Sequence, residues 1–147
     1  MNITDFLVSI RRINKMHESM LKEICEEYEL SLLEANIISF LHNHPSKDTA
    51  RDIVELRMLS KGNVSRAVEV LIQKRLLERE PDQQDRRKMH LSLLPASRGI
   101  TDAIDDKQNV FFKELFSGFS EQEKQQLWKF NERILKNADD IMRRRDI

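Results

Sequence analysis

Apolar residues recur every three or four positions along most of this chain, and the pattern changes only between residues 76 and 93. A period of three to four places apolar side chains on one face of an α-helix. Only three glycines and three prolines occur in 147 residues, which suits helices better than a sandwich or a barrel. The sequence therefore predicts a mainly α single domain, too short to hold a separate catalytic module.

Six helices are expected, separated by residues that cap or break them. Serine and threonine hydroxyls accept hydrogen bonds from the free amides of a helix's first turn, and a residue that precedes proline avoids helical dihedrals. These signals predict a long helix from Phe6, short helices that follow Ser31, residues 46–49 and Ser60, a fifth from Pro95 to Gly118, and a last one capped by Ser120 and Glu123.

Two short apolar runs, residues 76–80 and 89–93, flank a charged segment. Their partial alternation predicts a two-stranded β-hairpin with a charged tip. Residues 60–72, just before it, have one apolar face and one short, polar and basic face. Two short helices followed at once by a basic hairpin are the parts of a winged helix-turn-helix, which is the fold we predict.

The distribution of charge is more informative than its total, because 25 basic and 25 acidic residues cancel. Residues 57–98 contain ten Lys or Arg and five Asp or Glu, a local balance of +5, so the remainder carries −5. A basic centre on a weakly charged chain is typical of a nucleic-acid footprint. An α-helix fits the major groove, and an arginine on a hairpin can enter the minor groove. The candidates for DNA contact are Ser60, Lys61, Asn63, Ser65 and Arg66 in the helix and Arg86, Arg87 and Lys88 in the hairpin.

Residues 85–93, Asp-Arg-Arg-Lys-Met-His-Leu-Ser-Leu, resemble the wing signature D-x-R-x-x-x-hydrophobic-x-L of the MarR/SlyA family of bacterial transcriptional regulators. Residues 60–66 and 71–79 are similar to that family's recognition helix and first wing strand. The resemblance implies that Arg87 enters the minor groove and that Asp85 is the carboxylate that holds it. An arginine restrained in this way loses less conformational freedom on contact.

Three positions depart from the family pattern. Leu94 stands where threonine is usual, Ser97 lies near a usual glycine, and Arg75 replaces the glycine of the turn after the recognition helix. If that turn needs a positive φ, Arg75 adopts it at a strain of roughly 1 kcal/mol. We therefore expect the departures to affect local turn geometry and not the wing.

The terminal segments, residues 1–30 and 98–147, carry apolar stripes too long for a winged lobe of residues 31–97 to cover. The resemblance implies that these segments are dimerisation helices. A twofold pair places two recognition helices about 34 Å apart, one DNA turn, on a pseudo-palindromic operator. The resemblance also implies a small anionic or phenolic effector, bound between the lobe and the dimer helices, that regulates a repressor. Basic side chains that could meet such an anion are Arg11, Arg12 and Lys15.

A helical protein-interaction scaffold without DNA binding is the alternative. The sequence contains no glycine-rich phosphate loop, nucleophile elbow or paired-histidine motif, so no enzyme activity is expected. Four scattered histidines and one cysteine match no zinc spacing, and neither a metal nor a cofactor is expected. With no membrane-length apolar run and no signal peptide, the expected location is the cytoplasm.

Two further features have competing interpretations. Cys25 is interpreted as a core residue and not as a peroxide sensor, because its acidic neighbours raise the pKa of a thiol. The basic residues 143–145 either reach DNA phosphates or complement the dipole of the last helix.

Overall fold

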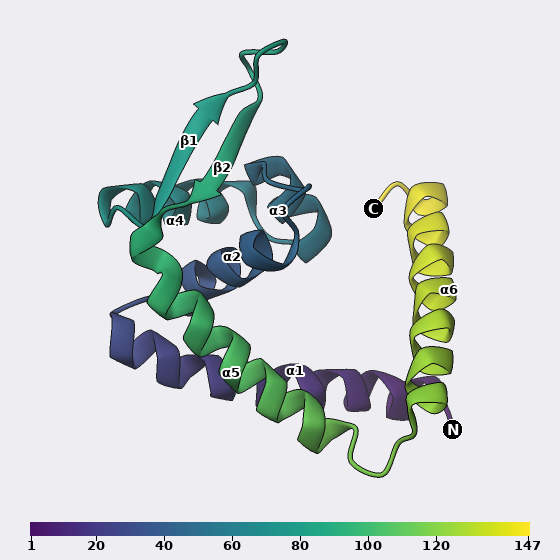
Figure 1. The fold of residues 1–147 in the computed structure, drawn as a ribbon. Helices are drawn as coiled ribbons and strands as arrows, with labels where there is room; N and C mark the ends of the chain where they lie inside the picture. Colours follow the sequence, from purple (N-terminus) through teal and green to yellow (C-terminus); the bar gives the residue numbers. More distant parts are fainter. The chain divides into compact units, whose positions relative to one another are not determined.

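The computed structural model describes residues 1–147 and contains six α-helices and one antiparallel two-stranded sheet (Figure 1). This confirms the predicted mainly α winged helix-turn-helix. The chain divides into two compact units, residues 1–109 and 110–147. The elements are α1 (Ile3–Tyr28), α2 (Leu32–Asn43), α3 (Ala50–Arg57), α4 (Lys61–Gln73), β1 (Leu77–Pro81), β2 (Met89–Leu93), the 3-10 turn η1 (Pro95–Ser97), α5 (Arg98–Leu115) and α6 (Glu121–Arg145).

The predicted capping residues begin the helices that they were expected to begin. The side chains of Ser31, Thr49, Ser60 and Ser120 accept hydrogen bonds from backbone amides three residues later. A hydroxyl at this position satisfies an amide that has no partner inside the helix. The starts of α2, α3, α4 and α6 were therefore predictable from the sequence.

Two helix boundaries differ from the prediction. Helix α1 begins at Ile3 and not near Phe6, because the Asn2 side chain accepts a hydrogen bond from the Asp5 amide at 2.9 Å and caps the helix earlier. Pro95 opens a short 3-10 turn and not α5 itself, which begins at Arg98 and ends at Leu115, before the expected Gly118.

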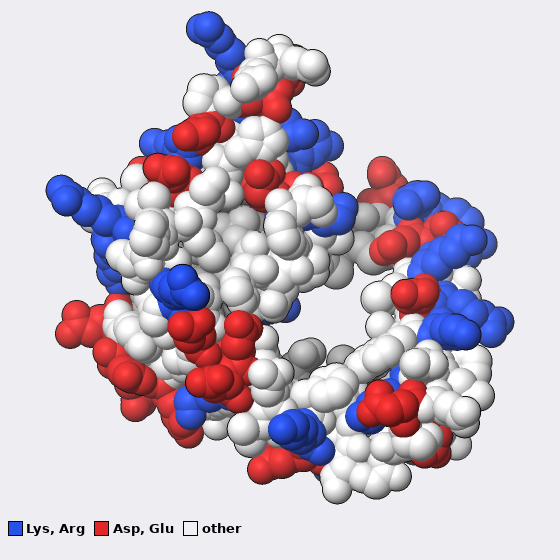
Figure 2. Space-filling model, viewed as in Figure 1, with Lys and Arg blue, Asp and Glu red and all other residues white.

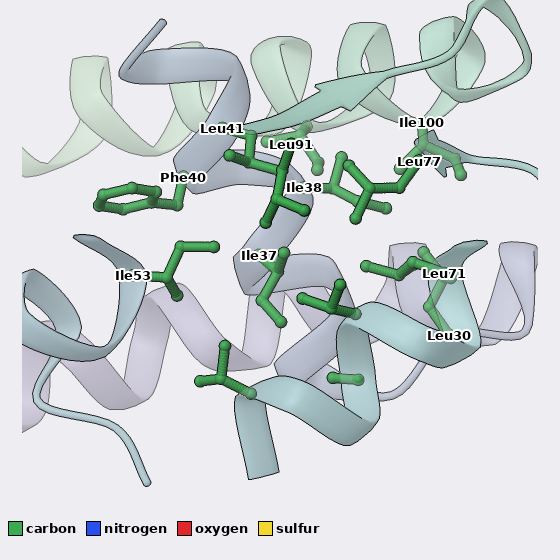
Figure 3. Packing of buried hydrophobic residues seen from close by; sticks show 14 of the residues in the cluster. Leu30, Ile37, Ile38, Phe40, Leu41, Ile53, Leu71, Leu77, Leu91 and Ile100 are labelled. Carbon is green, nitrogen blue, oxygen red and sulfur yellow. The ribbon is translucent and has the colours of Figure 1, made fainter. Parts of the chain in front are cut away.

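The hydrophobic core of the first unit is built around α2, which lies between α1 and α4 (Figure 1). Ile37 and Ile38 of α2 are fully buried and belong to the same hydrophobic cluster as Leu71 of α4 (Figure 3). The wing strands contribute Leu77 and Leu91 to the same cluster. Helix α4 and the wing therefore pack on one core, and this packing determines which of their residues face solvent.

The turn between α4 and β1 contains Arg75 with φ of 59°, in the left-handed region. Its amide donates to the carbonyl of Ile72 at 3.0 Å, and the next amide, of Leu76, donates to Leu71 at 3.0 Å. The turn thus requires the positive φ that glycine adopts most easily, as anticipated from the family pattern. A non-glycine residue here costs roughly 1 kcal/mol, and the rest of the lobe holds the turn in place.

An ion pair ties the C-terminal end of α4 to the start of α2. Lys74 Nζ donates to Glu34 Oε1 at 3.0 Å and to the Glu29 carbonyl at 2.6 Å. The Ser31 hydroxyl donates to the other carboxylate oxygen of Glu34 at 2.6 Å. Burial acts to raise the pKa of Glu34, but the hydrogen bonds from Ser31 and Lys74 outweigh it, so the pKa is lowered. Glu34 therefore stays ionised although its side chain is only 11% exposed.

Lys74→Met is expected to destabilise the protein by about 1–3 kcal/mol at neutral pH, because it leaves the Glu34 carboxylate without its cation. The loss should shrink as the pH falls below the ordinary Glu34 pKa of 4.5, since a protonated carboxyl needs no cation. Urea unfolding at about pH 7 and about pH 3.5 measures the difference. The exposed Lys22→Met is the control, and an equal loss at both pH values would contradict the assignment.

The second unit, residues 110–147, is held by aromatic contacts. The Trp128 ring lies 5.9 Å from that of Phe112 and 5.3 Å from that of Phe116, measured between ring centroids. No helix of the chain combines the length and the apolar character needed to cross a membrane. Large apolar side chains of α6 remain exposed: Leu127, Phe130, Ile134, Leu135 and Ile141.

Candidate nucleic-acid interface

Helix α4 presents a polar face to solvent because its apolar face is used by the core. Val64, Val68 and Leu71 are buried, at spacings of four and three. All of the residues predicted to contact DNA from this helix and its cap are exposed: Ser60, Lys61, Asn63, Ser65 and Arg66.

Asn63 and Arg66 form a pair on this face, in which the Arg66 guanidinium donates to the Asn63 side-chain carbonyl. They are three residues apart and therefore neighbours on one helix face. The Asn63 backbone amide donates to the Ser60 hydroxyl at 3.3 Å, which completes the helix cap. The arrangement leaves the Asn63 amide group available as a donor, and an asparagine can pair with an adenine edge in the major groove.

The wing extends from the side of the lobe that carries α3 and α4 (Figure 1). Its strands pair from Leu77↔Leu93 to Pro81↔Met89. Beyond the strands, the Asp82 carboxylate accepts hydrogen bonds from the amides of Gln84, at 3.0 Å, and Asp85, at 2.9 Å. One carboxylate therefore orders the start of the tip.

Asp85 holds Arg87, as the family resemblance implied. Asp85 Oδ1 accepts from the Arg87 backbone amide at 3.1 Å and from its Nε at 3.3 Å. The Arg87 side chain is nevertheless 93% exposed. The carboxylate restrains the inner part of the side chain, and the two terminal nitrogens of the guanidinium remain free to donate.

The wing carries basic and acidic side chains in different places. Figure 2 shows basic side chains at the tip of the wing and acidic ones along its strands. Arg79 of β1 forms an ion pair with Glu69 of α4, so this arginine is partly neutralised while it links the wing to the helix. The candidates for DNA contact in the tip, Arg86, Arg87 and Lys88, are all exposed.

A model of the MarR family matches residues 28–88, from the end of α1 to the tip of the wing. This segment belongs to the MarR family. The HTH-type transcriptional regulator TcaR of Staphylococcus aureus strain Newman is 29% identical over 105 residues, which cover 71% of this chain. The match spans only 62% of the length of TcaR.

Solved structures show the same fold. A MarR-family transcriptional regulator from Silicibacter pomeroyi superposes with a TM-score of 0.77 at 23% identity, over 92% of this chain and 89% of that one. S. aureus MepR in its DNA-binding conformation gives a TM-score of 0.80 at 20% identity, over 90% of this chain and 98% of that one. The likeness extends well beyond the MarR-family segment and includes helices on both sides of it.

The structure brings two further residues into view, Arg51 beside the wing and His90 within it, and neither was a candidate from the sequence. Arg51, in the first turn of α3, lines a groove of about 800 Å³ together with Asp85, Arg87 and Lys88. Its Nε donates to Glu55 at 2.8 Å. His90 of β2 lies between Asp48 and Asp82, with both distances 2.7 Å. For Arg51, the only signal in the sequence is a basic residue at a helix start, which is weak. The contacts of His90 could not be predicted, because Asp48 lies 42 residues away in the sequence.

A pocket of about 360 Å³ lies in the first unit, among α1, α2, α3 and α5. Arg57 lines it and donates to Asn36 Oδ1 at 3.1 Å. Burial, and then the nearby Arg57, lower the pKa of His17, with Glu18 opposing them. Arg11, Arg12 and Lys15 do not line this pocket, so their contact with an anion stays a prediction. The lining residues are His17, Asn36, Ser39, Phe40, Asn43, His44, Leu56, Arg57 and Gln108.

Cys25 is buried in α1. Burial raises the pKa of its thiol, and the carboxylates of Glu34 and Glu26 raise it further. A thiol with a raised pKa carries little of the reactive thiolate at neutral pH. The interpretation as a core cysteine is therefore supported by its surroundings.

The chain holds no group of three or more His, Cys, Asp or Glu side chains placed to hold a metal ion.

Proposed function

We propose that this protein is a sequence-specific DNA-binding transcriptional regulator of the cytoplasm, which binds a pseudo-palindromic operator as a homodimer. The observation that carries the proposal is that one lobe exposes both a polar helix face and a restrained arginine. Asn63 and Arg66 lie on α4, and Arg87 extends from the wing. A helix of this kind reads the major groove while a wing arginine enters the minor groove, where the potential is most negative.

The homodimer is proposed from the uncovered apolar faces of the terminal segments, residues 1–30 and 98–147. In α1, Ile3, Leu7 and Ile10 are exposed, and in α6, Phe130 is 54% and Ile134 47% exposed. Large apolar side chains left exposed at helical spacing on each of these helices mark an interaction site. A second copy is the occupant that also supplies a second recognition helix, and a twofold pair matches a twofold operator.

Selection of genomic fragments on the purified full-length protein tests the proposal, followed by titration of the best fragment at increasing salt. We expect binding that weakens steeply between low and physiological salt, because each phosphate contact releases counterions. Competition with unrelated DNA should not displace the selected fragment. Absence of salt-sensitive binding would favour the protein-interaction scaffold instead.

Asn63→Ala is expected to change the order of preference among operator variants, with a loss of about 1–3 kcal/mol at the base pair that Asn63 reads. Lys61→Ala is the matched comparison from the same turn, and it should weaken all fragments about equally, as a phosphate contact does. The measurement is affinity for a set of single-base operator variants. Equal losses across the whole set would remove Asn63 from base recognition.

Regulation by a small anionic or phenolic effector is proposed from the 360 Å³ pocket. The Arg57 guanidinium supplies a cation at its wall, and His17, whose pKa is lowered, is a neutral donor or acceptor suited to a phenol. The pocket lies among helices that support α3 and α4, so a ligand can shift the lobe between conformations of different DNA affinity. Together these features support a ligand-responsive repressor.

A screen of small aromatic acids for release of the selected DNA fragment tests this part of the proposal. Arg57→Ala should abolish the response to such acids while DNA affinity without ligand changes little. An undiminished response in Arg57→Ala would place the effector elsewhere.

A further inference from the structure

His90 connects two parts of the lobe that are far apart in the sequence. Its Nδ1 lies 2.7 Å from Asp48 Oδ1 and its Nε2 lies 2.7 Å from Asp82 Oδ1. A carboxylate only accepts hydrogen bonds, so an imidazole that contacts one at each nitrogen must carry a proton on both. The geometry is therefore that of an imidazolium held between two carboxylates.

Each of the two aspartates belongs to a different structural part. Asp48 lies directly before Thr49, the cap of α3, and its carbonyl accepts from the Leu91 amide at 2.7 Å. Thr49 and His90 also form an isolated antiparallel bridge. This side of the contact anchors β2 to the start of the helix-turn-helix.

Asp82 uses its two carboxylate oxygens for two different tasks. Oδ1 contacts His90, whereas Oδ2 accepts from the backbone amides of Gln84 and Asp85. Asp85 in turn holds Arg87 through its own carboxylate. An unbroken series of contacts therefore runs from the start of α3 through His90 to the wing arginine.

We propose that the His90 imidazolium is a positioning residue that clamps the base of the wing to the start of α3 and so presents Arg87 to DNA. The proposal rests on the DNA-binding function proposed above. It also makes the wing sensitive to pH, since histidine is the side chain whose charge changes most readily near neutrality.

The charged groups that face His90 are all acidic. They are Asp48 from the segment before α3, Asp82 from the base of the wing, and Glu80, which is its pairing partner across the sheet. The nearby cations Lys47 and Lys88 act on Asp52, whose pKa they help to lower. The charged groups that shift the pKa of His90 are Asp82 and Asp48, and no cation is among them.

The direction of the pH effect follows from these contacts. Hydrogen bonds to Asp82 and then to Asp48 raise the pKa of His90 above 6.5. The bond to His90 and the two backbone amides hold the pKa of Asp82 well below its ordinary 3.8. The clamp is therefore complete below pH 6.5, as long as Asp82 is ionised, and it is lost as the pH rises through the raised pKa of His90.

Two measurements on the full-length protein test the clamp. The first is an NMR titration of the His90 ring nitrogens, together with hydrogen exchange at the Gln84 and Asp85 amides, and it needs no DNA. We expect a midpoint above 6.5 and faster exchange at these amides once His90 loses its proton. The second is affinity for the selected DNA fragment from about pH 6 to about pH 9, where the wild type should weaken by about fivefold, as for loss of one exposed ion pair.

Variants separate a charge effect from a merely structural one. His90→Gln keeps hydrogen-bonding capacity but not charge, so it should bind like the alkaline wild type at every pH. His90→Lys supplies a fixed cation and should retain the tighter binding at alkaline pH. His42→Gln removes another histidine that contacts an aspartate, Asp105 at 2.9 Å, away from the wing; it is the control and should follow the wild-type profile.

Two results would overturn the clamp: a His90 midpoint at or below 6.5, or the same pH profile of binding in wild type and His90→Gln. Absence of DNA binding by the wild type at every pH would instead refute the proposed function. In that case the NMR titration and amide exchange would still decide whether His90 orders the wing.

Discussion

Replacement of Phe130 and Ile134 by serine is expected to convert the protein to a monomer and to weaken operator binding by about 10²–10⁴-fold. The two side chains lie four residues apart on α6 and are 54% and 47% exposed. Each apolar side chain of this size contributes about 1.5–3 kcal/mol when it is buried, and a twofold interface contains each of them twice. The loss of DNA binding follows because the second half-site contact becomes a separate bimolecular event.

Sedimentation equilibrium and operator titration measure the two parts of this prediction. The wild type should sediment at twice the chain mass of 17.5 kDa, and the double variant at the chain mass. The matched control is Glu132→Ser with Lys136→Ser, which changes two polar positions on the opposite side of α6 and leaves the net charge unaltered. A double variant that remained a dimer would place the interface on other residues.

Arg87→Ala is expected to weaken DNA binding by about 1–3 kcal/mol at many sequences, which is roughly 5- to 150-fold. The Arg87 side chain is 93% exposed, and the Asp85 carboxylate restrains its guanidinium at Nε. Little conformational freedom is therefore lost when the arginine enters the minor groove. Because the contact reads groove potential more than base identity, selected and unrelated fragments should weaken together.

Titrations of the Arg87→Ala protein with DNA at several salt concentrations measure the same contact through the salt dependence of affinity. The slope of log affinity against log salt should decrease by about one, the value for one lost phosphate or groove cation. Lys22→Ala removes an exposed charge on α1 and should leave both affinity and slope unchanged. Wild-type binding by Arg87→Ala would refute the role of the wing in DNA recognition.

The lobe was predictable from the sequence where local signals agree. Ser31, Thr49, Ser60 and Ser120 cap the helices that follow them, because capping depends on groups only three residues apart. The hairpin was visible as a change of period. Asp85 and Arg87 lie two residues apart, and the family resemblance implied their contact.

Contacts between distant segments were not predictable in this way. The His90 clamp joins residues 48, 82 and 90, and the pocket beside Arg57 collects side chains from four helices. The sequence offered Arg11, Arg12 and Lys15 only as basic side chains that could meet an anion, because a cluster of basic residues is visible in a sequence and a pocket wall is not. The predicted DNA contacts of α4 and the wing stay predictions until binding is measured.

The amino-acid sequence by itself determined the helices, their caps, the charged hairpin and the polar outer face of α4, because all of these follow from residues within a few positions of one another. Only the tertiary structure decided which carboxylates face His90 and which cation lines the pocket. The bridge between β2 and the segment before α3 brings Asp48 to His90, and α1, α2, α3 and α5 together form the pocket that Arg57 lines. A contact across tens of residues leaves no periodic trace in the sequence.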